Sequence, residues 1–306
     1  MHRRNLLTGA STLAAFSTLG ALLPAGASAA APAAPARGLV VEAIQMPAWT
    51  GPSDKRQPLA PGDVVSTAQE VETAAAAGLV LKMPEGSLIR LGEKTRLGVQ
   101  RLEVNDDGRI NVRSELKLFD GFFRFATTAV AKAVGTREID VGVRTATIGI
   151  RGTDFWAMTD AAHDAACLFE GKVDLATRDQ GALTLDKPTA FWARFFDKPV
   201  QPVGNATPDQ LVTFLKSTEL VPGKGVAVTG GRWRVVAGAF AKPAAASALQ
   251  ARLRAEGYPA IVKANAGAKK LAEVRINSFA TRGDAEAVLA KIAGIQGVEG
   301  RVALSA

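Results

Sequence analysis

The sequence has little of the side-chain chemistry on which most enzymes and metal centres depend. Its 306 residues include one cysteine, Cys167, and two histidines, His2 and His163. A single cysteine excludes an intramolecular disulfide framework and a cysteine-rich zinc site. No Ser-His-Asp set, P-loop or zincin motif is present in the sequence. We therefore expect no enzymatic activity, no metal and no cofactor, although a hydrolase that uses carboxylates alone stays compatible with the many acidic residues.

Soft metal ligands are limited to His163 and Cys167, four residues apart in an apparent hairpin loop at 160–166. A metal site needs further ligands, so we interpret Cys167 as a small buried residue that begins a strand. Four large aromatic residues are expected in the core: Trp156, Trp192, Phe195 and Phe196. The alternative is that the stretch 191–196 covers the edge of a partner protein. Gly152 is expected to permit a turn between core strands.

Long apolar runs are confined to the N-terminus. Two arginines at positions 3 and 4 precede an apolar stretch at 6–23 and a small-residue site, Ala27-Ser28-Ala29. This order is typical of a secretory signal peptide, here 1–29, and the paired arginines resemble a twin-arginine signal; an ordinary Sec signal is the alternative. No cysteine lies near the cleavage site, and no later stretch approaches the ~20 apolar residues of a membrane span. We therefore expect an exported, periplasmic protein without a lipid anchor or a transmembrane span.

Positive charge is concentrated in the last quarter of the chain. Residues 231–306 contain 12 basic and 5 acidic residues, whereas residues 30–230 contain 23 basic and 24 acidic ones. A basic module attracts nucleic acid, anionic lipid or anionic polysaccharide. Export makes nucleic acid the least available of these partners, so the charge favours a cell-wall or surface glycan.

The chain divides into an all-β part and an α+β part. After an Ala/Pro linker at 30–37, residues 38–200 alternate apolar and polar side chains in short segments, and Asn105-Asp106-Asp107-Gly108 predicts a hairpin turn. We expect about ten strands in a sandwich or short solenoid. Residues 201–230 then predict a helix at 207–220, with Thr207 as N-cap and Pro208 at its first position, and a Gly-rich linker at 221–231.

Residues 232–306 contain an internal repeat of 39 residues, in which Phe240 aligns with Phe279 and Ala246 with Ala285. The pattern predicts the order β-α-β-β-α-β, and therefore a four-stranded antiparallel sheet with two helices on one face. Strands are expected at 233–239, 260–264, 272–277 and 299–304, and helices at 243–256 and 283–293. Pro243 and Gly257 are expected to bound the first helix, and Thr281 with Asp284 to cap the second.

The C-terminal segment, 231–306, resembles the SPOR family of peptidoglycan-binding domains. The resemblance rests on Trp233–Phe240, on Gly257-Tyr258-Pro259-Ala260 after an Ala-rich helix, and on Val274–Phe279. It implies binding of glycan strands stripped of their stem peptides, across the open face of the sheet. Two positions depart from the family pattern, since Val236 stands in place of a glutamine and Asn277 in place of a glycine.

The middle segment, about 60–175, resembles the FecR-type periplasmic domain. Its motifs are Gly62–Thr67, Pro84–Gly92, Thr145–Phe155 and Phe169–Val173. Regulators of this family pass a signal through a membrane span to a cytoplasmic domain that controls a sigma factor. Neither a preceding cytoplasmic domain nor a span is recognised here, so the resemblance implies the fold and not that signalling role.

Strand alternation predicts which residues face solvent on the C-terminal sheet. Val235, Ala237, Val274 and Ile276 should point towards the helices and Trp233 should be partly buried at the sheet edge. Six residues are predicted on the open face as the glycan-binding site: Arg234, Val236, Ile261, Lys263, Arg275 and Asn277. Arg234, Lys263 and Arg275 would form a basic strip, and Asn277 could hydrogen-bond sugar hydroxyl and acetamido groups. The alternative is a solvated face without a ligand.

Two functions follow from these features. The first is a non-enzymatic envelope protein whose SPOR-like domain tethers a FecR-like domain to septal or denuded peptidoglycan, in line with a role in cell division. The second is a periplasmic adaptor or sensor whose FecR-like domain binds a protein or small ligand, with a degenerate SPOR-like module.

Overall fold

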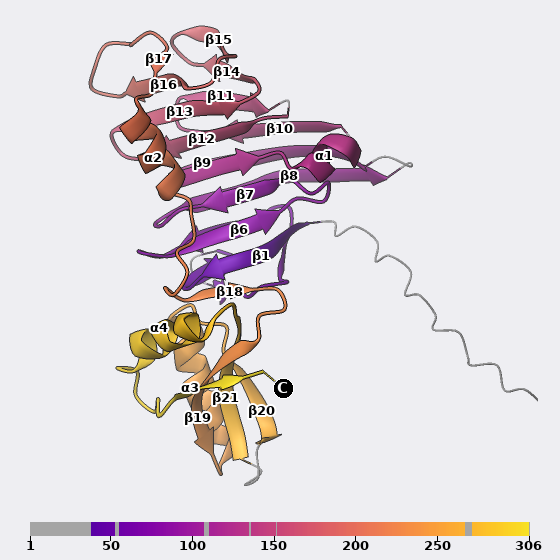
Figure 1. Ribbon diagram of the computed structural model, residues 1–306, viewed down its shortest axis with the longest axis vertical. Helices are drawn as coiled ribbons and strands as arrows, with labels where there is room; N and C mark the ends of the chain where they lie inside the picture. Colours follow the sequence, from indigo (N-terminus) through magenta and orange to yellow (C-terminus); the bar gives the residue numbers. More distant parts are fainter. Residues whose placement is uncertain are drawn as a thin grey trace, which may run out of the picture. The chain divides into compact units, whose positions relative to one another are not determined.

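The computed structural model describes residues 38–52, 55–106, 110–134, 136–150, 152–266 and 271–305 (Figure 1). The predicted signal peptide at 1–29 and the Ala/Pro linker at 30–37 lie outside the described residues, as do Asp107 and Gly108 of the predicted hairpin turn. Within the described residues, no helix is long and apolar enough to cross a membrane.

Two β-sheets make up the N-terminal part of the described chain. The first sheet runs in the order β16 (Ala190–Phe195), β13 (His163–Glu170), β12 (Asp154–Thr159), β9 (Ile110–Ala126), β7 (Leu88–Leu91), β6 (Gly78–Lys82) and β1 (Leu39–Gln45). The second runs β3 (Gln57–Pro58), β2 (Ala48–Thr50), β5 (Glu70–Thr73), β8 (Arg96–Asp106), β9, β10 (Arg137–Gly142), β11 (Ala146–Ile150), β14 (Val173–Thr177) and β15 (Gly181–Leu185). Two short strands, β4 (Val64–Val65) and β17 (Gly204–Asn205), pair with β1 and β16.

Strand β9 belongs to both sheets. Its first part pairs with β8 and β10, and its last part, from Gly121 on, pairs with β7 and β12. Gly121 has a φ of +97°, and a Cβ atom there would lie 2.3 Å from Oγ1 of Thr95. Only glycine fits this close approach, so the strand passes from one sheet to the other at a position where no side chain is possible.

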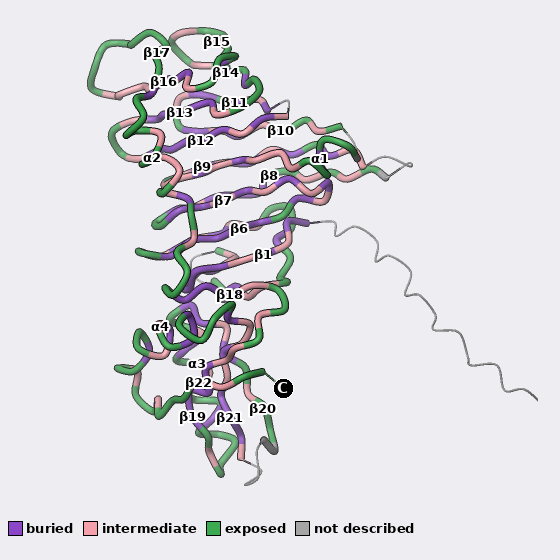
Figure 2. The backbone as a smooth tube through the Cα atoms, viewed as in Figure 1, coloured by how far each residue is buried: buried purple, intermediate pink, exposed green. Residues whose placement is uncertain are grey.

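The core lies between the two sheets, in agreement with the predicted all-β fold, for which a sandwich or a short solenoid was expected. Phe123, Phe155, Ile148 and Trp192 are fully buried in one apolar cluster, and buried positions alternate with less buried ones along the strands (Figure 2). Phe195 and Phe196, which we expected in the core, are only half-buried, because they lie where β16 ends. The part of 38–200 that the structure describes contains strands β1–β16, more than the ten predicted, and a short helix, α1 (Ala129–Val134), that the sequence did not predict.

Helix α2 (Pro208–Lys216) covers the outer face of the first sheet (Figure 1). Thr207 is its N-cap and Pro208 its first residue, as predicted, but the helix ends four residues earlier than expected. The ring of Phe214 stacks on Trp156 at 4.0 Å and on Phe191 at 5.6 Å. The Trp156 indole donates a hydrogen bond of 2.9 Å to Oγ of Ser217. Trp156 therefore lies in a second apolar cluster outside the main core.

Replacing Phe214 by alanine is expected to loosen α2 from the sheet. Losing a stacked aromatic side chain that is half-buried should cost about 2 kcal/mol, somewhat less than for a fully buried ring. Denaturant unfolding should report this loss, and Trp156 fluorescence should shift to longer wavelength because the indole gains contact with water. Val212→Ala, on the exposed side of the same helix, serves as the control. An unchanged emission spectrum in the Phe214→Ala protein would contradict this account of α2.

The Gly-rich segment 221–231 is not a free linker. It contains β18 (Val226–Val228), which pairs with β1 through Ala43↔Val228 and with β21 (Leu271–Phe279) through Ala227↔Phe279. This strand was not predicted, because three residues between glycines are too few to show an alternation. Val226 and Ala227 are buried and Val228 is half-buried, and the segment pairs with another strand on each side.

The C-terminal part has the predicted β-α-β-β-α-β order. Its elements are β19 (Trp233–Phe240), α3 (Pro243–Ala255), β20 (Ile261–Ala266), β21, α4 (Arg282–Ile292) and β22 (Arg301–Leu304). The antiparallel sheet has the strand order β20-β21-β19-β22. Thr281 caps α4 by accepting a hydrogen bond from the Asp284 amide, and Gly257 follows α3 with a φ of +84°, both as expected. Both helices pack their apolar residues against one face of this sheet.

Candidate functional site

The open face of the C-terminal sheet carries a row of side chains that crosses all four strands. The strand register places Arg301, Val236, Arg275 and Ile261 directly opposite one another, from β22 to β20. Directly paired residues point to the same face of a sheet. Three predicted site residues therefore meet in this row. Arg301 was not predicted, although extending the same alternation to the last strand could have found it.

The other predicted residues lie on either side of this row. Lys263 is paired with Glu273 and is exposed. Arg234 and Asn277 lie two residues from Val236 and Arg275, on the opposite side of the row from Lys263. The ladder bulges next to Asn277, where Ser278 has a φ of +70°, and Asn277 itself is half-buried. All six predicted residues thus share one face.

Val236 needs a correction, because it lies on the predicted face but is only 1% exposed. In the register it is flanked by Arg275 on one strand and Arg301 on the other. The stems of two arginines beside a valine leave it little surface towards solvent. Val236 therefore supports the neighbouring arginines and does not itself offer a contact surface. Trp233 is partly buried against the core, as expected.

A buried carboxylate divides the predicted basic strip. The side chain of Glu273 is 7% exposed. It forms salt bridges with Arg275, at an N···O distance of 2.7 Å, and with Arg301, at 2.9 Å. Burial by itself would raise the pKa of Glu273, but the hydrogen bonds from Arg275 and Arg301 together outweigh burial and lower this pKa. One carboxylate thus holds two guanidinium groups in fixed orientations and leaves the three residues with one net positive charge.

Glu273→Gln is expected to destabilise the protein by about 2 kcal/mol at neutral pH, since two charge-assisted hydrogen bonds lose their ionised acceptor. The folded-state pKa of Glu273 lies below the unfolded value, so its stabilisation is complete above about pH 4.3 and is lost as pH falls through the folded pKa. Unfolding free energies of the two proteins should therefore converge in acid. A difference that stays constant from pH 7 to pH 3 would contradict this role.

Arg234 contributes a hydrogen-bond donor that has no partner among the described residues. Its Nε atom is buried and unpaired. Burial, and after it the positive charge of Arg275, lower the pKa of Arg234. An unpaired buried donor beside other cations favours an incoming acceptor, ideally one with negative charge.

The remaining candidate pair, His163 with Cys167, lies on strand β13. Strand β13 begins at His163, so the predicted loop is shorter than expected, and Cys167 lies within the strand instead of at its start. Nδ1 of His163 lies 3.1 Å from Oδ1 of Asp160. Burial raises the pKa of the Cys167 thiol to about 12, so it is not a reactive thiolate. Among the described residues, no group of three or more His, Cys, Asp or Glu side chains is arranged to hold a metal ion.

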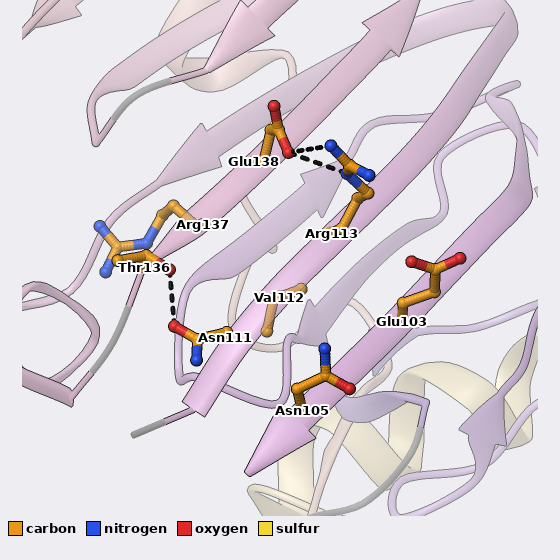
Figure 3. A pocket seen from close by; sticks show the side chains of 8 residues that line it. All are labelled: Glu103, Asn105, Asn111, Val112, Arg113, Thr136, Arg137 and Glu138. Atoms are coloured by element: carbon orange, nitrogen blue, oxygen red, sulfur yellow. Dashed lines mark hydrogen bonds and ion pairs between the residues drawn. The ribbon is translucent and has the colours of Figure 1, made fainter. Parts of the chain in front are cut away.

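A polar cavity of about 440 Å³ lies where β8, β9 and β10 adjoin (Figure 3). Arg113 donates to Oε2 of Glu138 at 2.7–2.8 Å, and Thr136 donates to Asn111 at 2.6 Å. The hydrogen bond to Glu138 raises the pKa of Arg113. Arg113 and Glu138 therefore pair with each other, and Glu103 and Arg137 also line this cavity.

Two protein-family models match separate parts of the chain. The model described as FecR protein matches residues 69–174, and the model described as SPOR domain matches residues 229–301. The search of curated proteins found no match to this chain.

Among solved structures, two crystal structures of a proposed anti-sigma factor from Parabacteroides distasonis ATCC 8503 are similar to this chain. They share 15% and 14% identity with it and each has a TM-score of 0.36. The matches cover 48% and 77% of this chain, and 64% and 97% of those chains. So slight a likeness carries no argument about function. The two family models agree with the two sheet architectures described above, and the chain therefore carries a FecR domain followed by a SPOR domain.

Proposed function

We propose that the SPOR domain binds the glycan strands of peptidoglycan with the open face of its sheet, and so attaches the FecR domain to the cell wall of the periplasm. The observation that carries this proposal is the arrangement of Arg275 and Arg301 around the buried carboxylate of Glu273. Guanidinium groups held in this way keep N–H donors free for further acceptors.

The chemistry of denuded glycan suits this face. A glycan strand without stem peptides presents sugar hydroxyls, acetamido carbonyls and the free carboxylates of its lactyl groups. Arg234 offers an unpaired donor, Asn277 an amide, and Ile261, 44% exposed, an apolar surface for a sugar ring. α3 and α4 both pack on the opposite face, so neither helix covers these groups.

Co-sedimentation with sacculi tests the proposal. The chain from residue 30 onward should pellet more strongly with sacculi whose stem peptides an amidase has removed than with intact sacculi. This preference should persist at 0.3 M salt, because hydrogen bonds and close ion pairs are screened less than long-range attraction. Equal binding to both kinds of sacculi, or binding that disappears with salt, would contradict a glycan-specific face.

We propose that the FecR domain binds another envelope protein. A test of this second role should keep α2, because a fragment of residues 38–200 would expose Trp156 and Phe191, which Phe214 covers in the whole chain. A fragment ending near residue 220 avoids this artificial apolar surface. A defined partner that binds this longer fragment and not the SPOR domain alone would support the adaptor role.

A further inference from the structure

An apolar cavity of about 670 Å³ lies beside the C-terminal end of α2. Its walls come from the turn before β6, from the α2–β18 connection and from α4, and Figure 1 shows this connection running along the first sheet towards β18. Ala76, Ala77, Phe122 and Val221 supply apolar surface. Cavities of this size and composition hold small molecules in other proteins.

The walls of this cavity are held in place by specific contacts. Gln45, 8% exposed, donates from Nε2 to the Ala76 carbonyl at 2.6 Å and accepts from the Val221 amide at 2.8 Å. The connection lies so close to the sheet that a Cβ atom on Gly92 would be 2.0 Å from the Ser217 carbonyl oxygen. The cavity is therefore preformed and does not depend on a ligand to shape it.

The charges around the cavity favour an anion. Three lysines line it, Lys216, Lys224 and Lys291, and among the described residues none of them is ion-paired with a carboxylate. Nζ of Lys291 donates only to backbone carbonyl oxygens, those of Met46 and Lys224, at 3.3 Å each. Partial burial, and then the charge of Lys224, lower the pKa of Lys291. Two ammonium groups thus lie near each other without a counterion.

The two acidic residues of the lining have other partners. Glu93 accepts a hydrogen bond of 2.6 Å from the Ala76 amide. Glu219 interacts electrostatically with Arg90 and Arg124. Among the described residues neither carboxylate is ion-paired with a lysine, and the three lysines outnumber the two carboxylates of the lining.

We propose that this cavity binds a small amphiphilic carboxylate, with its apolar chain against Phe122 and Val221 and its carboxylate between Lys224 and Lys291. The site is separate from the glycan-binding face and does not rest on it. Because Lys291 belongs to the SPOR domain and Phe122 to the FecR domain, such a ligand contacts both domains at once.

Isothermal titration calorimetry with decanoate, on the chain from residue 30 onward, tests this site. We expect saturable binding of one decanoate per chain, and at least tenfold weaker binding of decanol and of decyltrimethylammonium, which lack the negative charge. Equal binding of decanoate and decanol would overturn the role of the lysines. The absence of any saturable decanoate binding would overturn the site.

Two variants and a control locate the binding. Lys224→Gln with Lys291→Gln should weaken decanoate binding at least tenfold, and Thr213→Phe, at an exposed position of the cavity wall, should block it. Lys172→Gln with Lys187→Gln removes the same charge at positions outside the cavity lining and should leave binding unchanged. Melting curves of all variants should match the parent protein, and undiminished decanoate binding in both cavity variants would contradict the assignment.

Discussion

Replacing Arg234 and Arg301 together by glutamine is expected to reduce binding to amidase-treated sacculi at least tenfold. Each arginine can make a charge-assisted hydrogen bond worth about 1.5–3 kcal/mol, and about 1.4 kcal/mol corresponds to a factor of ten in affinity. The side chain of Arg301 is 61% exposed, and Arg234 is half-buried with a buried Nε atom that has no partner among the described residues, so both arginines keep some surface and hydrogen-bonding capacity on this face. Arg275 is left in place because it alone then keeps Glu273 paired.

The matched control is Arg252→Gln with Arg282→Gln. These arginines lie on α3 and α4, on the opposite side of the domain, and their replacement lowers the net charge by the same amount. If general positive charge attracts the glycan, both double variants should lose binding equally. Only a selective loss in the Arg234 and Arg301 variant supports a specific face, and equal losses would refute it.

Asp284→Ala is expected to destabilise the protein by about 3–5 kcal/mol, the range for removing one partner of a buried charged network. Asp284 is fully buried, and its Oδ1 accepts backbone N–H bonds from Gly223, Gly225 and Val226 at 2.8–3.1 Å. Its Oδ2 accepts from Thr281 at 2.6 Å. Alanine would leave three backbone donors without an acceptor, each a separate cost in a buried site.

Asp284→Asn separates geometry from charge in this experiment. The amide oxygen of asparagine can still accept hydrogen bonds from the three N–H groups. The unfolding free energy should therefore fall clearly less in the Asp284→Asn protein than in the Asp284→Ala protein. Hydrogen exchange should show where the loss falls, since the amides of Gly225 and Val226 should exchange faster in the alanine protein. Unchanged protection of these amides would mean that Asp284 does not hold the segment that leads into β18.

The stability of β18 bears on how the two domains communicate. β18 pairs with β1 of the FecR part and with β21 of the SPOR sheet, so one three-residue strand joins the sheets of the two domains. This strand and the residues that Asp284 holds form one connection between the two domains, beside side-chain contacts such as that of Arg254 with Gln57. Loss of the Asp284 network should therefore weaken the attachment between the domains before it weakens either core.

Local patterns in the sequence determined most of the fold. Strand alternation and turn residues predicted an all-β sandwich or short solenoid, and the 39-residue repeat predicted the βαββαβ domain. Local patterns also predicted caps such as Thr281 with Asp284. Strict alternation also placed Arg234, Ile261, Lys263 and Arg275 on one face, because side chains along a strand point to alternate sides. These features depend on neighbours along the chain, and so they can be read without the tertiary structure.

Contacts between distant segments were decided only by the tertiary structure. The sequence could not indicate that Glu273 holds Arg275 and Arg301, that Val236 is covered between two arginines, or that a glycine-flanked stretch becomes β18. The cavity beside Lys291 likewise gathers residues separated by more than two hundred positions. Such features arise from register across strands and from backbone groups that need partners once buried. Their partners lie far away along the chain, and only folding brings them together.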